Sequence, residues 1–132
     1  MLGEEIGSGQ GKRTTRRVLG TEPFKVEASF EDGVKLLGLD GLNIGTYIAS
    51  IKPDGSLSGT GEGAFASPVG EMATWKAVGT GSMAADGSVH YRGSIAFTTN
   101  GAKLAALNAT PVLFDFIIDA QGNTKSRFWA WK

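Results

Sequence analysis

The sequence predicts an all-β protein: an antiparallel meander of about eight or nine strands, closed into a small β-barrel with one short helix. Glycine-centred turns recur between short segments in which apolar and polar residues alternate. Pairing the segments across those turns keeps apolar side chains on one face. Closure would remove the free strand edges, and an open sandwich of two sheets is the alternative.

Composition indicates a single domain over residues 1–132, with 41% apolar residues and a core that buries roughly two thirds of the unfolded chain's surface. Thirteen basic and thirteen acidic residues cancel, which argues against nucleic acid or a membrane surface as a partner. With no cysteine and a single histidine, the usual metal sites cannot form, and we expect no cofactor. We expect a cytoplasmic protein, because neither a signal peptide nor a membrane span is evident.

The N-terminal segment is the least regular. Three glycines spaced two apart precede a basic run, Lys12 to Arg17, which is a poor start for the helix of a dinucleotide-binding motif. In a regular strand Lys12 and Arg16 would point to one side and Arg13 and Arg17 to the other, so neither face could pack on an apolar core. The basic run is therefore interpreted as an edge strand, a solvated arm or an anion-binding patch.

The first predicted hairpin begins at Phe24. A three-residue loop at Glu31–Gly33 would pair Phe30 with Val34 and keep apolar groups on one face.

The second hairpin turns at Pro53–Gly55, where the proline ring presets the backbone for the loop. This loop pairs Ile51 with Leu57 and Tyr47 with Gly61. An aromatic ring across a cross-strand glycine is a device of strongly curved sheets.

The third hairpin, Glu71–Thr99, turns at Ala85–Gly87 and repeats the arrangement, with Met83 opposite Val89 and Tyr91 over Gly81. A two-residue loop would instead place Met83 against His90 and mix apolar with polar groups, so the three-residue loop is favoured.

A short helix is predicted next, with Asn100 as its N-cap and with Leu104 and Leu107 on one face. Such a segment is typical of a lid on the end of a barrel.

The last hairpin, from Pro111 onward, turns at Gly122 and sets Asp115 opposite Arg127, which we expect to form a structural ion pair. Both faces of this hairpin carry large apolar groups. We therefore expect one face to line the core and the other to be covered by the N-terminal segment or by a second subunit of a homo-oligomer.

In its overall pattern the chain resembles small barrels of the allene oxide cyclase and lipocalin type. It is more closely similar to uncharacterised prokaryotic proteins ending in a GNT and W-x-W-K hairpin, here Gly122–Lys132. The resemblance covers residues 43–132 and implies a barrel that binds an apolar molecule, not a reaction. The Gly-x-Trp signature of lipocalins is missing, and no cyclase residue can be transferred to a numbered position.

Two groups of side chains are candidates for function. The aromatic candidates share the predicted inward face, where they either line a pocket or fill the core; they are Tyr47, Phe65, Trp75, Tyr91 and Phe97. The polar candidates are Glu62, His90, Arg92, Asp115 and Arg127.

Three function classes follow. The leading hypothesis is a non-enzymatic barrel that binds a small apolar or amphipathic molecule. The competing hypothesis is a cofactor-free cyclase or isomerase that uses a carboxylate of the lumen or His90. The third is a structural homo-oligomeric barrel without a ligand.

Overall fold

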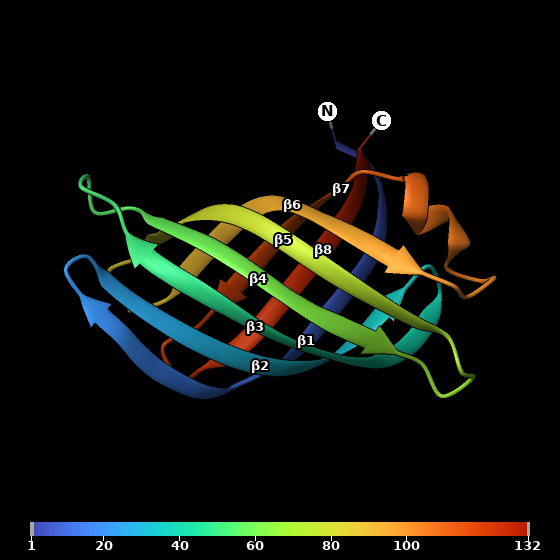
Figure 1. Cartoon of the computed structure of the whole chain (residues 1–132), viewed down its shortest axis with the longest axis horizontal. Helices are drawn as coiled ribbons and strands as arrows, with labels where there is room; N and C mark the ends of the chain where they lie inside the picture. Colours follow the sequence, from blue (N-terminus) through green and yellow to red (C-terminus); the bar gives the residue numbers. More distant parts are fainter. Residues whose placement is uncertain (1, 132) are drawn as a thin grey trace.

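The computed structural model describes residues 2–131 and is a closed barrel in which every strand pairs with its neighbours in sequence, as Figure 1 shows. The strands are β1 (Leu2–Thr21), β2 (Phe24–Leu36), β3 (Leu39–Ile51), β4 (Leu57–Ala66), β5 (Met72–Met83), β6 (Val89–Thr99), β7 (Val112–Ile118) and β8 (Asn123–Trp131). All neighbours are antiparallel, and β8 pairs with β1 to close the ring. The predicted all-β meander barrel is therefore confirmed.

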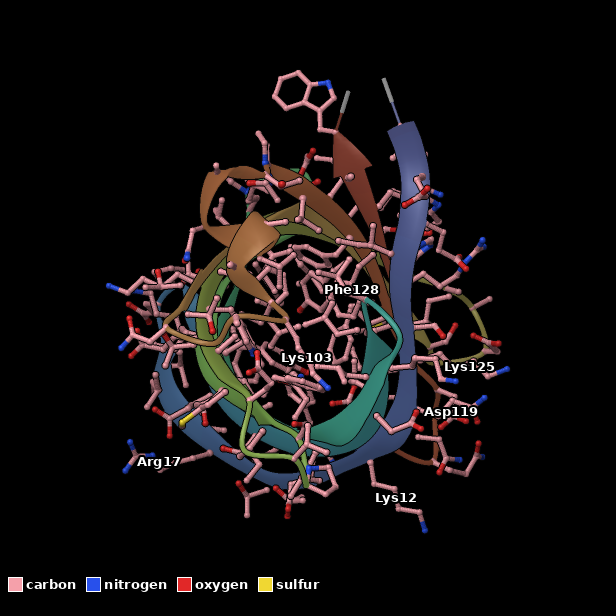
Figure 2. The ribbon with its side chains drawn as sticks, turned by 90° about the vertical axis from the view of Figure 1, so that its right-hand side faces the viewer. Lys12, Arg17, Lys103, Asp119, Lys125 and Phe128 are labelled. Carbon is pink, nitrogen blue, oxygen red and sulfur yellow. The ribbon has the colours of Figure 1, made fainter. Side chains whose placement is uncertain are left out.

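Alternation of inward and outward residues explains the burial pattern. On β8, Thr124, Ser126 and Phe128 are buried, whereas Lys125 and Arg127 are exposed. Seen end-on in Figure 2, Phe128 lies inside the ring and Lys125 points away from it. One face of every strand thus contributes to a single shared core.

The two central hairpins have the predicted registers. Tyr47 pairs with Gly61 on β4, and Tyr91 pairs with Gly81 on β5. Gly55 and Gly87 in the turns adopt φ values of +88°, a region where a side chain would be strained. The sequence pattern therefore determined both pairings through turn chemistry and face separation together.

The first hairpin prediction is wrong. β2 runs without interruption through Glu31–Gly33, and the chain turns later, at Leu37 and Gly38, which have φ values of 49° and 83°. Ladders on both sides, with β1 and β3, outweigh the local preference of Asp-Gly for a turn. As a result Asp32 lies in the middle of a strand and points into the barrel.

β1 closes the barrel only over its first part. Its ladder with β8 ends at the pair Lys12–Asn123, and residues 13–21 continue beside β2. The edge-strand interpretation of the basic run is confirmed for this second part.

The predicted facing of the basic run is wrong. A β-bulge between Arg13 and Thr15 shifts the alternation, so Arg13 pairs with inward-facing Phe30 and Arg16 with inward-facing Ala28. Arg13 and Arg16 thus share the inward side.

A short lid covers one end of the barrel (Figure 1). It is a single 3-10 turn, η1 (Ala105–Ala109), with Leu104 and Leu107 buried beneath it as expected. Asn100 does not cap it. Asn108 instead fastens it to β6, since its amide exchanges two hydrogen bonds of 2.9 Å with the backbone of Thr99. Among residues 2–131, no helix is long and apolar enough to cross a membrane.

Candidate functional site

A cavity of about 70 Å³ lies inside the barrel. It exists because the inward positions on β4 and β5 include Gly59, Gly61 and Gly79, which contribute no side chains to fill the interior. The remaining wall is mainly aromatic, formed by Phe30, Tyr47, Trp75, Tyr91, Phe114, Phe116 and Phe128. This arrangement suits a small ligand that is mostly apolar.

The aromatic rings are positioned by glycines on the neighbouring strands. A Cβ on Gly81 would lie 2.6 Å from the ring of Tyr91, and one on Gly59 would lie 3.2 Å from it. Trp75 covers Gly63 in the same way, with 2.5 Å between its ring and such a Cβ. Side chains at these glycines would displace the rings that line the cavity.

One side of the cavity is polar and carries a buried carboxylate. Asp32 is only 2% exposed, and its Oδ1 accepts a hydrogen bond of 3.1 Å from Nδ2 of Asn43. Oδ1 of Asn43 accepts a hydrogen bond of 2.8 Å from the indole Nε1 of Trp75. Ser126 Oγ donates to Asp32 Oδ2 at 3.4 Å. The network connects β2, β3, β5 and β8.

Two glycines on β1 allow this network to form. Gly11 pairs with Asp32, and a side chain at Gly11 would collide with the backbone of Asp32. Gly9 pairs with Ser126, and a Cβ there would lie 3.0 Å from the Ser126 hydroxyl. Asp32 and Ser126 can therefore meet across the strand that separates them.

The environment of Asp32 changes its acidity. Burial raises the pKa of Asp32 to about 6, and the hydrogen bonds from Asn43 and Ser126 only partly offset that rise. Within residues 2–131, no basic side chain forms an ion pair with this carboxylate. Asp32 can therefore take up or release a proton near neutral pH, or accept a hydrogen bond from a ligand.

Asp32 was not among the site residues predicted from the sequence, because Glu-Asp-Gly is typical of a turn. A signal was nevertheless present: Asp32 falls on the same alternate positions as Ala28, Phe30 and Val34, all of which are buried.

The aromatic candidates lie where the pairing placed them. Trp75, Tyr91, Phe65 and Phe97 are buried, and Tyr47 is half-buried against the core. Tyr47, Trp75 and Tyr91 line the cavity. Phe65 and Phe97 instead surround a much smaller space, of about 10 Å³, on the lid side of Trp75.

The polar candidates lie on the outer surface. Glu62 is exposed on β4, opposite Lys76 on β5. His90 Nε2 and Arg92 Nε approach the same oxygen of Asp115, at 3.4 Å and 3.8 Å, on the outside of β6 and β7. The carboxylate of the lumen is thus Asp32, and His90 does not share the cavity.

The prediction that Asp115 and Arg127 form an ion pair is wrong. The two residues do face each other in the β7–β8 ladder, as the predicted register requires. Arg127 Nε pairs with Glu5 on β1 at 2.7 Å, and its guanidinium lies 4.7 Å from the ring centre of Trp129. Closure of the barrel supplies Glu5 as the better partner. β1 pairs edge to edge with β8, so the N-terminal segment does not cover the outer face of the last hairpin.

No family model matches the chain, and no curated protein matches it. Among solved structures, a protein of unknown function from Clostridium acetobutylicum aligns with a TM-score of 0.85 and 13% identity over 98% of both chains. A beta-barrel like protein from Acinetobacter baumannii has a TM-score of 0.82 and 12% identity, over 98% of this chain and 94% of that one. An enzyme from Penicillium herquei has a TM-score of 0.68 and 13% identity, over 96% and 92% of the two chains.

At such low identities the comparisons concern the fold alone. The expected similarity to uncharacterised prokaryotic barrels is confirmed: this chain has the same closed β-barrel fold as bacterial proteins of unknown function.

Proposed function

We propose that the barrel binds a small, mostly apolar ligand in its interior cavity. The observation that carries the proposal is the aromatic cavity with a buried carboxylate, Asp32, in its wall. Aromatic side chains supply apolar contact area, and a few polar groups orient a ligand. Asp32 and Asn43 provide such groups on one side only.

The size of the cavity limits what it can hold. An engineered protein cavity of about 150 Å³ takes up benzene. A volume of about 70 Å³ accommodates a few carbon atoms without rearrangement. A ring therefore needs movement of a wall residue, and half-buried Tyr47 is the wall residue we expect to move. We call the end of the barrel opposite the lid, at the β7–β8 turn, the open end.

Titration with neutral alcohols, from propan-2-ol to benzyl alcohol, tests the proposal by proton–nitrogen NMR. The indole signal of Trp75 reports on the cavity, because its N–H is bonded to Asn43 beside Asp32. Trp129 and Trp131 lie on the outer face of β8 and are internal references. We expect saturable movement of the Trp75 signal alone. Equal movement of all three signals, or no movement, would contradict an interior site.

A matched variant strengthens this test. Ala77 lines the cavity, so Ala77→Leu fills it, whereas Ala96→Leu adds the same side chain at an exposed position on β6. Uptake should be lost in the first variant and kept in the second. Native mass spectrometry of protein purified from cells then identifies any molecule that co-purifies.

A second candidate is a cofactor-free isomerase, favoured by the pKa of Asp32 of about 6. Such a carboxylate would accept a proton from the carbon beside a ligand carbonyl and return it to another atom of the same ligand, with no change in redox state. Cyclopentanone in deuterium oxide is a direct probe. Exchange of its α-hydrogens by wild type and not by Asp32→Asn would support the enzyme, and exchange at the buffer rate would exclude this reaction for the probe.

A further inference from the structure

We propose that Arg13 and Arg16 form an anion-binding site at the open end of the barrel, and that the ligand is an amphipathic anion with its apolar part in the cavity. This inference rests on the proposed function and adds the chemical class of the ligand.

The strand register places both arginines on the cavity side. Arg13 pairs with Phe30, which lines the cavity, and Arg16 pairs with Ala28, which is buried in the barrel. Directly paired residues of antiparallel strands project from the same face. Lys12 and Arg17, by contrast, point away from the ring in Figure 2. The bulge after Arg13 thus brings Arg16 to the same face as Arg13.

Arg13 lies at the turn that borders the open end. Its backbone N–H donates a hydrogen bond of 2.8 Å to Gly122 in the β7–β8 turn. Its guanidinium lies over the same glycine, with Nη2 3.4 Å from where a Cβ would be.

Tyr47 connects this end to the cavity. Burial raises the pKa of the Tyr47 phenol, and the positive charges of Arg13 and Arg16 oppose that rise. The ladders agree with this, since Arg16 pairs with Ala28 on β2 and Ala28 pairs with Tyr47 on β3, which places Arg16 and Tyr47 in one row of inward-facing positions. Tyr47 also lines the cavity, so this row joins the basic residues of β1 to the cavity wall.

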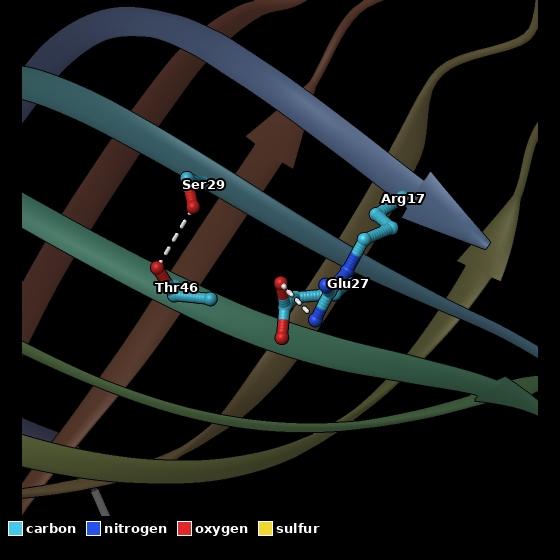
Figure 3. Close-up of polar contacts among 4 residues, drawn as sticks. All are labelled: Arg17, Glu27, Ser29 and Thr46. Atoms are coloured by element: carbon cyan, nitrogen blue, oxygen red, sulfur yellow. Dashed lines mark hydrogen bonds and ion pairs between the residues drawn. The ribbon is translucent and has the colours of Figure 1, made fainter. Parts of the chain in front are cut away.

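Both arginines are available to an external anion. In the described chain, neither has a carboxylate within 4.0 Å. Asp119 in the adjacent turn accepts from the backbone N–H groups of Gln121 and Asn123 instead. Glu27 pairs with Arg17 on the outer face at 3.3 Å, as Figure 3 shows. Arginine presents several donors in a planar fork that fits a carboxylate.

The charges also determine the orientation of the ligand. Asp32 lies in the cavity wall without a basic partner in residues 2–131, so it repels an anionic group inside the cavity. Arg13 and Arg16 attract an anionic group at the open end. An amphipathic carboxylate would therefore enter with its apolar end first.

Benzoate and benzamide provide the test, because they have nearly the same shape and differ in charge. We expect wild type to bind benzoate roughly tenfold more tightly than benzamide, measured from the Trp75 indole signal. The double variant Arg13→Gln/Arg16→Gln should lose this preference, because benzoate then has no cationic partner at this end of the barrel. The matched control Lys12→Gln/Arg17→Gln removes the same charge from the outer face and should keep the preference.

The outcomes separate the two proposals. Equal binding of both compounds by wild type, or a preference that survives in Arg13→Gln/Arg16→Gln, overturns the anion site and leaves the cavity proposal standing. Loss of the preference in both double variants also overturns it, because only net charge would then matter. If neither compound moves the Trp75 signal in wild type, both proposals are refuted for ligands of this size.

Discussion

The two ends of the barrel are built from the same strands and filled differently. At the lid end, Leu104, Phe65 and Val112 are at most 1% exposed, and the residual space there is about 10 Å³. Toward the other end, glycines occupy several inward positions and leave a cavity of about 70 Å³. Strands β3 to β8 alternate regularly through both halves, so there the size of the inward side chain decides between close packing and open space.

This difference assigns distinct roles to the two halves. The lid half should supply a large share of the stability, because close-packed apolar groups contribute most when removed from water. The half around Tyr47 and Tyr91 should contribute less to stability and more to binding. Substitutions in each half test this division, and substitutions on the outer face of the last hairpin test regions outside it.

The largest effect is expected for Phe65→Ala in the lid half. The side chain is 1% exposed, so its removal should lower the free energy of unfolding by about 3–5 kcal/mol. Tyr47→Ala is the comparison variant and should cost less, because Tyr47 is only half-buried. Urea unfolding followed by circular dichroism measures both, and a larger loss for Tyr47→Ala would reverse the assignment.

Asp32→Asn tests the carboxylate of the cavity. Because a pKa unit corresponds to about 1.4 kcal/mol, the rise from 3.8 to about 6 corresponds to roughly 3 kcal/mol. A raised carboxyl pKa stabilises the folded state at low pH, and this contribution disappears as the pH rises through the folded-state pKa. Relative to the variant, wild type should therefore lose roughly 3 kcal/mol between about pH 4 and pH 7. A constant difference across this range would indicate an ordinary acidity for Asp32.

Ala77→Leu fills the cavity and should separate binding from stability. Added side-chain volume in a packed interior costs about 1–3 kcal/mol, and an existing space reduces that cost. We expect a loss near the lower limit together with loss of alcohol uptake. Retained uptake would place the ligand somewhere other than the cavity.

Asp115→Asn should have a small effect, because its contacts with His90 and Arg92 are partly exposed to water. Pairs of this kind contribute below about 1 kcal/mol. A double-mutant cycle with Arg92→Gln measures the coupling directly. A loss of several kcal/mol would mean that the outer face of β7 is buried in solution.

Trp131→Ser addresses that outer face and should leave the unfolding of a monomer almost unchanged, because the side chain is 53% exposed. The expectation that a second subunit covers the last hairpin remains a prediction. Sedimentation equilibrium of wild type should show a dimer that Trp131→Ser weakens. A monomeric wild type would contradict the prediction that a second subunit covers the last hairpin.

The sequence predicted the fold wherever turn chemistry and face separation agreed. The register around Tyr47 and Gly61 follows from Pro-Asp-Gly and from the alternation of apolar residues, and both signals are local. Asp32 was missed because its local signal indicated a turn, while two neighbouring ladders kept it in a strand. The pairing of Glu5 with Arg127 could not be predicted, since it depends on contact between the first and last strands.

The side of β1 to which Arg13 and Arg16 point could not be predicted from the sequence either. One extra residue in a bulge reverses the side to which a strand's later residues point. No composition or spacing in the basic run marks where that residue is inserted.

The hydrogen bond between Ser126 and Asp32 joins residues 94 positions apart, across the seam where the ends of the chain meet. Contacts of such long sequence separation form late and slowly during folding. A nascent chain that lacks its last strand can build the central hairpins but has no Ser126 to complete the polar wall. We therefore expect completion of the cavity wall and closure of the barrel to occur in the same folding step, and a refolding intermediate with an unpaired first strand should not take up the alcohols proposed as ligands.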